Sequence, residues 1–200
     1  MQTPTLKAVK NKSAITKATP KAPIRASKKD DAIVILTSDH AKVKKLFKEF
    51  EKLSKKNDVA GKTKVANEIC LELTVHAQAE EEVFYTAARS ATHEDALLNE
   101  ADVEHDSAKE LIAQIQTMSP EDPMYDAKVT VLGEYIEHHV EEEETEMFPK
   151  VRKTKLDLIE LGLRLKTRED EIKSSLTSLN GDVNIPALKK SAQDAALNKH

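Results

Sequence analysis

Two short stretches of the chain each place a histidine four residues before a glutamate, a spacing that puts both side chains on one face of a helix. The two pairs are His76–Glu80 and His139–Glu143, and an aromatic residue follows each of them. A helix presents an imidazole and a carboxylate to one metal ion in this way. A single pair of this kind is more often an ordinary hydrogen-bonded pair, so the pattern of the whole chain must decide.

The composition indicates a helical protein. Charged residues make up 33% of the 200 residues, aromatic residues only 4%, and there are four glycines. A chain of this kind, rich in Ala, Lys, Glu and Leu, favours helices over strands. The one cysteine, Cys70, excludes an intramolecular disulfide and predicts a reducing, cytoplasmic location, with Cys70 itself a packing residue. No apolar run approaches the roughly 18 residues of a membrane span, and the N-terminus lacks the apolar segment of a secretory signal.

The positive charge is concentrated at the N-terminus. Residues 1–29 hold eight Lys and Arg and no acid, which leaves a charge of −12 on the rest of the chain. Such a segment cannot bury enough apolar surface to order itself, so we expect residues 1–29 to be a disordered basic tail. A basic tail can bind nucleic acid, but this one has no aromatic residue for base stacking. We therefore favour a solubilising tail over a nucleic-acid partner.

Apolar residues recur at intervals of three and four along most of the chain, which predicts amphipathic helices. Loop signals separate them, at Asn57-Asp58 and Gly61 and again at Ser119-Pro120 through Pro123. The predicted helices run over about 32–55, 62–88, 93–117 and 124–148, with Pro149 closing or kinking the last. Four long helices joined by short loops predict an all-α, up-down-up-down four-helix bundle over residues 30–152.

A further amphipathic stretch follows the predicted bundle. Within residues 153–180, leucines and isoleucines at helical spacing predict an additional C-terminal helix that packs on the bundle or pairs with another copy. Asn180-Gly181 is typical of a helix end. We expect residues 181–200 to be a flexible tail, in which only 187–197 have a weak helical pattern.

Each of the four predicted bundle helices carries one histidine in the middle of its apolar stripe, and two of them add a carboxylate. These residues are His40, His76, Glu80, His105, His139 and Glu143. Burying unpaired carboxylates costs several kcal/mol each, and imidazole with carboxylate suits iron, zinc, manganese or copper. Six ligands exceed the four of a closed zinc site. Two metals, bridged by carboxylates and by a solvent-derived oxo or hydroxo group, fit better. Neighbouring acids such as Glu81 and Glu144, and also His138, are expected to face solvent.

The arrangement resembles the hemerythrin-like, or HHE cation-binding, domains over about residues 31–152. The matching motifs are Ser38-Asp39-His40, His76-x-x-x-Glu80, Glu104-His105 and His139-x-x-x-Glu143 with Phe148-Pro149. The resemblance implies a non-haem di-iron centre whose ligands are the six residues above. It also implies small-molecule partners, namely dioxygen, peroxide or nitric oxide.

The chain departs from the oxygen-carrying members of that family in two ways. The carriers have a His-x-x-x-His pair on the third helix, whereas here Ala101 and Lys109 flank His105 at that spacing. This argues against reversible oxygen carriage. The carriers also space the last pair by five, which would select Glu144. Helix geometry favours Glu143, which lies about 40° around the helix from His139, whereas Glu144 lies about 140° away.

Three functions follow from these residues. The first is a di-iron protein that binds or senses oxygen or iron and serves in protection against oxidative stress. The second is an enzyme of the same site that acts on peroxide, oxygen or nitric oxide, with Tyr85 or Tyr135 as a nearby donor. The third is a structural or nucleic-acid-interacting protein that uses the basic tail and the fifth helix. A ferritin-like site is disfavoured, because it needs Glu three residues before His.

Overall fold

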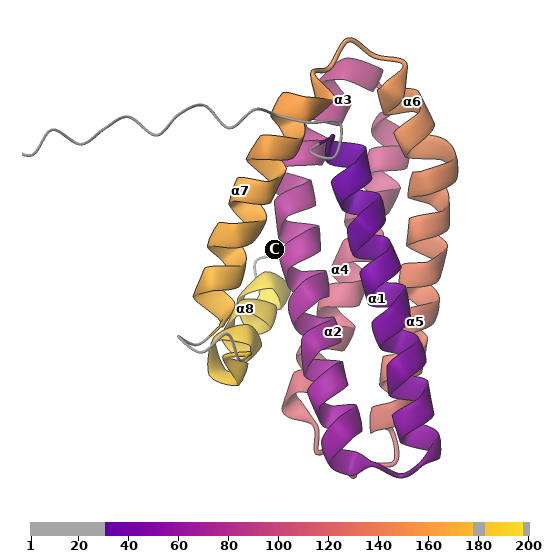
Figure 1. Cartoon of the computed structure of the whole chain (residues 1–200), viewed down its shortest axis with the longest axis vertical. Helices are drawn as coiled ribbons and strands as arrows, with labels where there is room; N and C mark the ends of the chain where they lie inside the picture. The colour runs from indigo at the N-terminus through magenta and orange to yellow at the C-terminus, as the bar shows by residue number, and fades with distance from the viewer. Residues whose placement is uncertain (1–30, 178–182, 198–200) are drawn as a thin grey trace, which may run out of the picture.

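The computed structural model describes residues 31–177 and 183–197, and over these ranges the chain is helical with no β-strand (Figure 1). The all-α fold that the sequence predicts is therefore confirmed. The basic tail predicted at 1–29 lies outside the described residues. The elements are α1 (Ala32–Lys55), α2 (Val59–Ala79), η2 (Glu80–Tyr85), α3 (Thr86–Thr92), α4 (Asp95–Thr117), α5 (Tyr125–Glu142), η3 (Glu143–Met147), α6 (Phe148–Arg152), α7 (Leu158–Leu176) and α8 (Ile185–Leu197), where η marks a π-helical turn.

The start of the bundle is fixed by a capping carboxylate. Asp31 Oδ1 accepts hydrogen bonds from the backbone N–H of Ile33 at 2.9 Å and of Val34 at 3.4 Å, which satisfies two of the free donors at the start of α1. The other carboxylate oxygen of Asp31 lies 3.2 Å from Nη1 of Arg152, at the end of α6. The two ends of the bundle's chain are thus tied together.

The α1–α2 loop is shorter than predicted because a second aspartate begins α2 early. Asn57 has a positive φ of 54°, and Asp58 then accepts a hydrogen bond from the backbone N–H of Gly61 at 2.9 Å. A Cβ atom at Gly61 would lie 2.5 Å from Oδ2 of Asp58, so a larger residue there would displace the capping carboxylate. Helix α2 therefore starts at Val59, three residues before the position that the apolar pattern indicated.

Figure 1 shows α1, α2, α4 and α5 side by side, with the chain reversing direction between consecutive helices of this set. The apolar stripes predicted from the sequence face inward, as Leu36, Ile69, Leu98 and Leu132 illustrate. Helices α1 and α5 come close where Gly133 lies against the ring of Phe47, since a Cβ there would be 3.2 Å from the ring. Among the described residues, most buried polar side chains gather toward the α3–α6 end of the bundle, where the histidines lie, while Lys62 and Gln116 are buried toward the other end.

The last bundle helix continues past the proline that was expected to close or kink it. Pro149 lacks a backbone donor, and its ring crowds the preceding turn of an α-helix. Here the preceding turn is the wide π turn η3, and the chain stays helical through α6 to Arg152. The break after α4 is as predicted: helix α4 ends at Thr117 and α5 begins at Tyr125.

Two helices pack on the outside of the bundle. Helix α7 lies along α1 and α2 and buries Leu161, Leu165 and Ile172 (Figure 1), in agreement with the prediction of an additional helix that packs on the bundle. Within the expected flexible tail, Ile185–Leu197, which includes the weak helical pattern at 187–197, forms α8. This helix packs mainly against α4 and fully buries Leu188. None of the helices within the described ranges has both the length and the apolar character to cross a bilayer.

Candidate metal centre

The six residues that the sequence singled out lie together in the bundle interior. One histidine comes from each of α1, α2, α4 and α5, and the two glutamates are the first residues of η2 and η3. All six are buried, and none exposes more than 7% of its surface. These residues are His40, His76, Glu80, His105, His139 and Glu143.

The six residues form two groups of three, each with two imidazoles and one carboxylate. The first group is His40, His76 and Glu143, and the second is Glu80, His105 and His139. Within each group one ligand atom per residue lies within 4.8 Å of the others. Two histidines and one carboxylate are the ligand set typical of non-haem iron that keeps open positions.

Each carboxylate also lies close to a histidine of the other group. Oε2 of Glu80 is 3.0 Å from Nε2 of His76 and 3.7 Å from Nε2 of His105. A carboxylate in that position can bridge two cations. Both groups are therefore parts of one centre.

The second carboxylate repeats this relationship. Oε2 of Glu143 lies 3.2 Å from Nε2 of His40 and 3.4 Å from Nε2 of His139, and these two histidines belong to different groups. The centre is thus nearly symmetric, with two carboxylates between two pairs of imidazoles.

Several polar atoms at this centre are buried without a hydrogen-bond partner. Buried polar groups are normally satisfied, and each unpaired one costs about 1–3 kcal/mol or more when charged. Here the unpaired atoms come from α1, from α2 with its π turn η2, and from η3, and they gather as ligand atoms around a cation would. The atoms are Nε2 of His40, both ring nitrogens of His76, both oxygens of Glu80 and Oε2 of Glu143. The residues present therefore fit a buried metal centre.

A ring of outer carboxylates faces the opposite nitrogen, Nδ1, of the histidines. Each of these acids stands next in sequence to an inner residue on one helix and reaches the histidine of the next helix. The shortest contact is between His139 Nδ1 and Glu104 Oε2, at 2.8 Å. The others are His40 with Glu144 at 2.9 Å, His105 with Glu81 at 2.9 Å, and His76 with Asp39 at 3.8 Å.

This outer ring fixes how the imidazoles are presented. A carboxylate that accepts from Nδ1–H holds the tautomer in which Nε2 is free to bind a metal, and it increases the basicity of the ring. The sequence analysis expected Glu81 and Glu144 to face solvent. Glu144 is exposed and Glu81 is partly buried, and each side chain contacts Nδ1 of a histidine on another helix, which was not predicted. The sequence does contain a sign of this outer ring, because an acid directly precedes a histidine in Asp39-His40 and in Glu104-His105. An acid at that position cannot reach its own neighbour's ring, but it can reach an adjacent helix.

The charges of the centre shift the pKa values of its members. Burial lowers the pKa of His76, but the charge of Glu80 and the nearby carboxylate of Asp39 outweigh burial and hold that pKa well above its usual value. The pKa of His139 is also raised, because the charge of Glu143 and the hydrogen bond to Glu104 outweigh the effect of burial. Burial raises the pKa of Glu143, yet His139 and His40 together keep it below its usual range.

Glu143 rather than Glu144 occupies the interior. Glu143 is buried, whereas the Glu144 side chain is 40% exposed and contacts Nδ1 of His40 from outside. Both inner glutamates open a π turn: the N–H of Phe148, for example, bonds to the carbonyl of Glu143 five residues earlier. Such turns occur often at functional sites. The apolar spacing of the sequence gave no sign of them, because a π turn adds one residue without breaking the helix.

Tyr85 is the only one of the two proposed tyrosine donors that reaches the centre. Its hydroxyl donates to Oε1 of Glu143 at 2.8 Å, and its ring stacks on His105 with centroids 5.4 Å apart. Burial and the charge of Glu143 raise its pKa well above the usual value, so the hydroxyl keeps its proton. Tyr135 is half exposed on the surface of α5, and its proposed role is therefore not supported.

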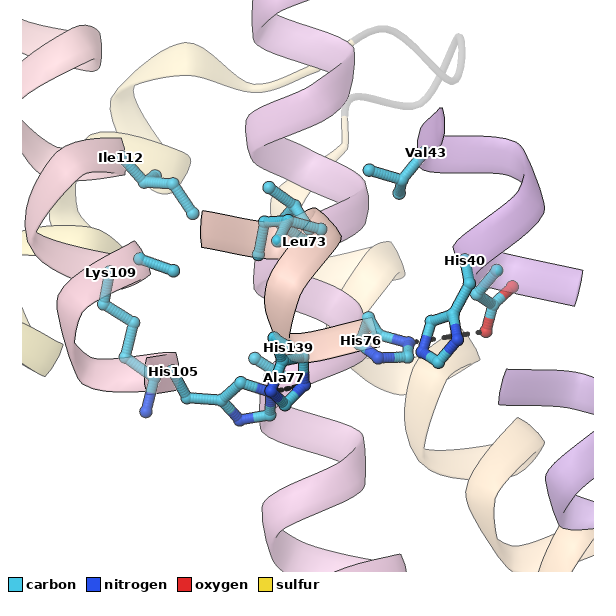
Figure 2. Close-up of a pocket in the computed structure, with 12 residues that line it drawn as sticks. His40, Val43, Leu73, His76, Ala77, His105, Lys109, Ile112 and His139 are labelled. Atoms are coloured by element: carbon cyan, nitrogen blue, oxygen red, sulfur yellow. Dashed lines mark hydrogen bonds and ion pairs between the residues drawn. The ribbon is translucent and has the colours of Figure 1, made fainter. Parts of the chain in front are cut away.

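A small cavity of about 20 Å³ adjoins the histidines. Figure 2 shows His76, His105 and His139 gathered on one side of it, with Val43, Leu73 and Ile112 on the other. The volume suffices for about one water-sized molecule. The apolar wall is completed by Ala77, Ala108 and Ile136.

The remaining residues of interest add no ligand atom to this centre. Ala101 is buried and offers no ligand atom, and Lys109 forms an ion pair with Glu81 at 2.6 Å. Neither adds a fifth histidine. His138 is exposed, as predicted. Cys70 is a buried free thiol whose pKa is raised to about 12 by burial, which agrees with a packing role.

Comparisons with known proteins agree with the geometry. The family model described as the hemerythrin HHE cation binding domain matches residues 31–151. A protein of Nostoc sp. named DNA nickase is 33% identical over 142 residues, which are 70% of this chain but only 39% of the relative. The fold is similar to that of a hemerythrin HHE cation binding domain-containing protein from Mycobacterium kansasii. That match has a TM-score of 0.64 at 23% identity and covers 80% of this chain and 98% of the other.

Proposed function

Because the chain belongs to the hemerythrin HHE cation-binding family, we propose that it holds two iron ions at its buried centre and binds dioxygen or peroxide there. The observation that supports this most directly is the division of the six residues into two groups of two histidines and one glutamate. Glu80 and Glu143 lie between the groups, which suits a pair of cations. Two iron ions would supply the paired electron changes that dioxygen and peroxide require.

The chain's own residues give the centre its properties. Asp39, Glu81, Glu104 and Glu144 hold the imidazoles with Nε2 directed inward. The apolar wall of the cavity excludes bulk water and leaves room for one small molecule. Tyr85 holds a proton 2.8 Å from Glu143, where a reduced oxygen species would need one.

Anaerobic reconstitution with ferrous iron tests this proposal. We expect close to two irons per chain, and a change in the near-ultraviolet and visible spectrum when air or peroxide is admitted. The variant Glu80→Gln should hold fewer irons, whereas Glu82→Gln, which changes an exposed glutamate two residues away, should hold two. A chain that retains no iron after reconstitution and desalting would show the proposal to be wrong.

An enzyme that removes peroxide is the related alternative. The specific observation in its favour is the buried hydroxyl of Tyr85, which can donate a proton and which a simple store would not need. Oxygen evolution from peroxide by the iron-loaded protein would support an enzyme. Spectral change without turnover would leave binding or sensing as the function.

Cleavage of DNA is a second candidate, because one relative is named DNA nickase. A groove on α1 lined by Lys45, Lys48, Lys52 and Lys56 offers cations for a phosphate backbone. The rest of the chain carries more acidic than basic residues, and this negative charge opposes DNA binding. Incubating supercoiled plasmid with the iron-loaded protein tests the candidate. Relaxed circles that disappear when Lys48 and Lys52 become Glu would support it, and intact plasmid would exclude it.

A further inference from the structure

A second cluster of metal-binding side chains lies outside the buried centre, on the surface between α4 and α5. Nε2 of His138 is 3.6 Å from Oε1 of Glu104 and 3.4 Å from Oε1 of Glu142. The three atoms lie within 4.8 Å of one another. His138 is exposed and the two glutamates are partly exposed, so the cluster is open to solvent.

Two members of the cluster repeat the spacing of the pairs His76–Glu80 and His139–Glu143. His138 and Glu142 are four residues apart on α5, the spacing that brings an imidazole and a carboxylate to one point. Glu104 joins them from α4. An ion held there would have ligands on two well-packed helices, and the imidazole would favour a transition metal over magnesium or calcium.

The local charge favours a cation. Glu104 and Glu142 come together from two facing helices, and Glu100 and Glu146 lie four residues from them along the chain, about one helical turn away. Like charges gathered on two facing helices repel one another, and a bound cation would remove that repulsion.

One carboxylate connects the cluster to the interior. Oε2 of Glu104 contacts Nδ1 of His139 at 2.8 Å, while Oε1 of the same side chain faces His138 on the outside. His139 is buried, so the hydrogen bond to it fixes the orientation of Glu104. The outer oxygen is therefore presented at a defined position and does not depend on a mobile surface side chain.

We propose that Glu104, His138 and Glu142 form an outer site for a divalent transition metal ion such as Zn²⁺ or Fe²⁺. This site is separate from the six residues of the buried centre and does not depend on which metal the buried centre holds. With three ligands and open positions filled by water, it should bind more weakly than the buried centre and exchange its ion readily.

Zinc titration of the full chain by calorimetry tests the proposal, with iron content measured before and after. The readout is the difference between the chain and its His138→Ala variant, which should bind one zinc fewer. Glu142→Gln should weaken the same site at least tenfold. Glu104 is left unchanged because it also supports His139. Glu141→Gln, which changes an exposed neighbour on α5, serves as the matched control and should leave zinc binding as it is.

The result that overturns the proposal is equal zinc stoichiometry for the chain and for His138→Ala, with both proteins folded by circular dichroism. A loss of zinc in Glu141→Gln equal to that in His138→Ala would also overturn it, because it would indicate diffuse attraction to acidic residues. Either outcome is independent of iron in the interior. If the buried centre holds no iron, the difference of one zinc is still expected.

Discussion

Nε2 of His105 and Nε2 of His139 face each other across 3.1 Å in the interior of the bundle. Both rings also contact a carboxylate through Nδ1, His105 with Glu81 and His139 with Glu104. If each Nδ1 carries a proton, a neutral ring directs a lone pair from Nε2. Two lone pairs at this distance repel unless a cation lies between them. In the metal-free protein a proton on His139, whose pKa is raised, would fill this role, and a bound metal would replace it.

Metal binding should therefore release protons. The pKa values of His76 and His139 are both raised in the metal-free protein, so these imidazoles bind protons more tightly than free histidines do, and a metal must displace those protons. We expect about one proton or more per chain. Calorimetry with ferrous or zinc ion in two buffers of different ionisation enthalpy measures the number. Identical heats in the two buffers would contradict the expectation.

The stability of the metal-free protein should fall as pH rises above neutrality. A histidine whose pKa is raised on folding stabilises the fold below its unfolded pKa, about 6.5, and this contribution is lost as pH rises through the folded pKa. His76 and His139 both act in this direction. Urea denaturation of the metal-free chain between pH 6 and 9 would test it. The metal-loaded chain should show the opposite trend, because metals bind neutral imidazole.

Replacing Glu143 and Glu144 one at a time distinguishes the glutamate that binds metal from the glutamate that only supports a histidine. Glu143→Gln removes a charge that lies between both groups, so we expect loss of at least one iron per chain. Glu144→Gln changes only the contact to Nδ1 of His40, and two irons should remain with about 10–100-fold weaker affinity. Iron content after dialysis against a weak chelator gives both numbers. Loss of iron in Glu144→Gln alone would identify Glu144 as the ligand.

Removing the hydroxyl of Tyr85 should cost stability and leave iron in place. Tyr85→Phe keeps the ring that stacks on His105 but leaves Oε1 of Glu143 without its donor. The cost in the metal-free protein is about 1–3 kcal/mol, as for other buried acceptors that lose their donor. Denaturant unfolding and iron analysis are the two measurements. Iron loss in this variant would mean that Tyr85 acts through Glu143 on metal binding.

Filling the cavity should slow the reaction with oxygen species without emptying the centre. Ala108 lines the cavity beside the histidines, and Ala108→Leu adds three carbon atoms to a space of about 20 Å³. Overpacking of this kind costs about 1–3 kcal/mol, which a bundle of this size can absorb. Stopped-flow spectroscopy after mixing with air or peroxide should show a slower change than in the unaltered chain. An unchanged rate would mean that reactants enter elsewhere.

The sequence predicted the positions of the inner six residues well because each lies on a long, regular helix. A histidine in the middle of an apolar stripe, as at His40 or His105, must face the core wherever the helix packs. The helix period alone also placed Glu143 inside and Glu144 outside. These are local properties, and local properties can be read from spacing.

Features that depend on contacts between helices could not be read in this way. The partner of His139 is Glu104, from a different helix, and only the packing of α4 against α5 brings them together. The π turns at Glu80 and Glu143 likewise leave no mark on the apolar pattern. The weak helical pattern at 187–197 did not predict a packed helix α8, because its short apolar stripe becomes informative only once α4 offers a surface for Leu188.

The assignment of ligands to the two groups has a consequence for folding. Each group takes residues from both halves of the chain: the first joins His40 and His76 to Glu143, and the second joins Glu80 to His105 and His139. A bound cation would close a loop between positions 40 and 143, as a disulfide does in other proteins. Crosslinks of about 100 residues remove on the order of 4–5 kcal/mol of chain entropy from the unfolded state. This chain, with its single cysteine, can form no internal disulfide, and the metal centre could take that place as a reversible crosslink.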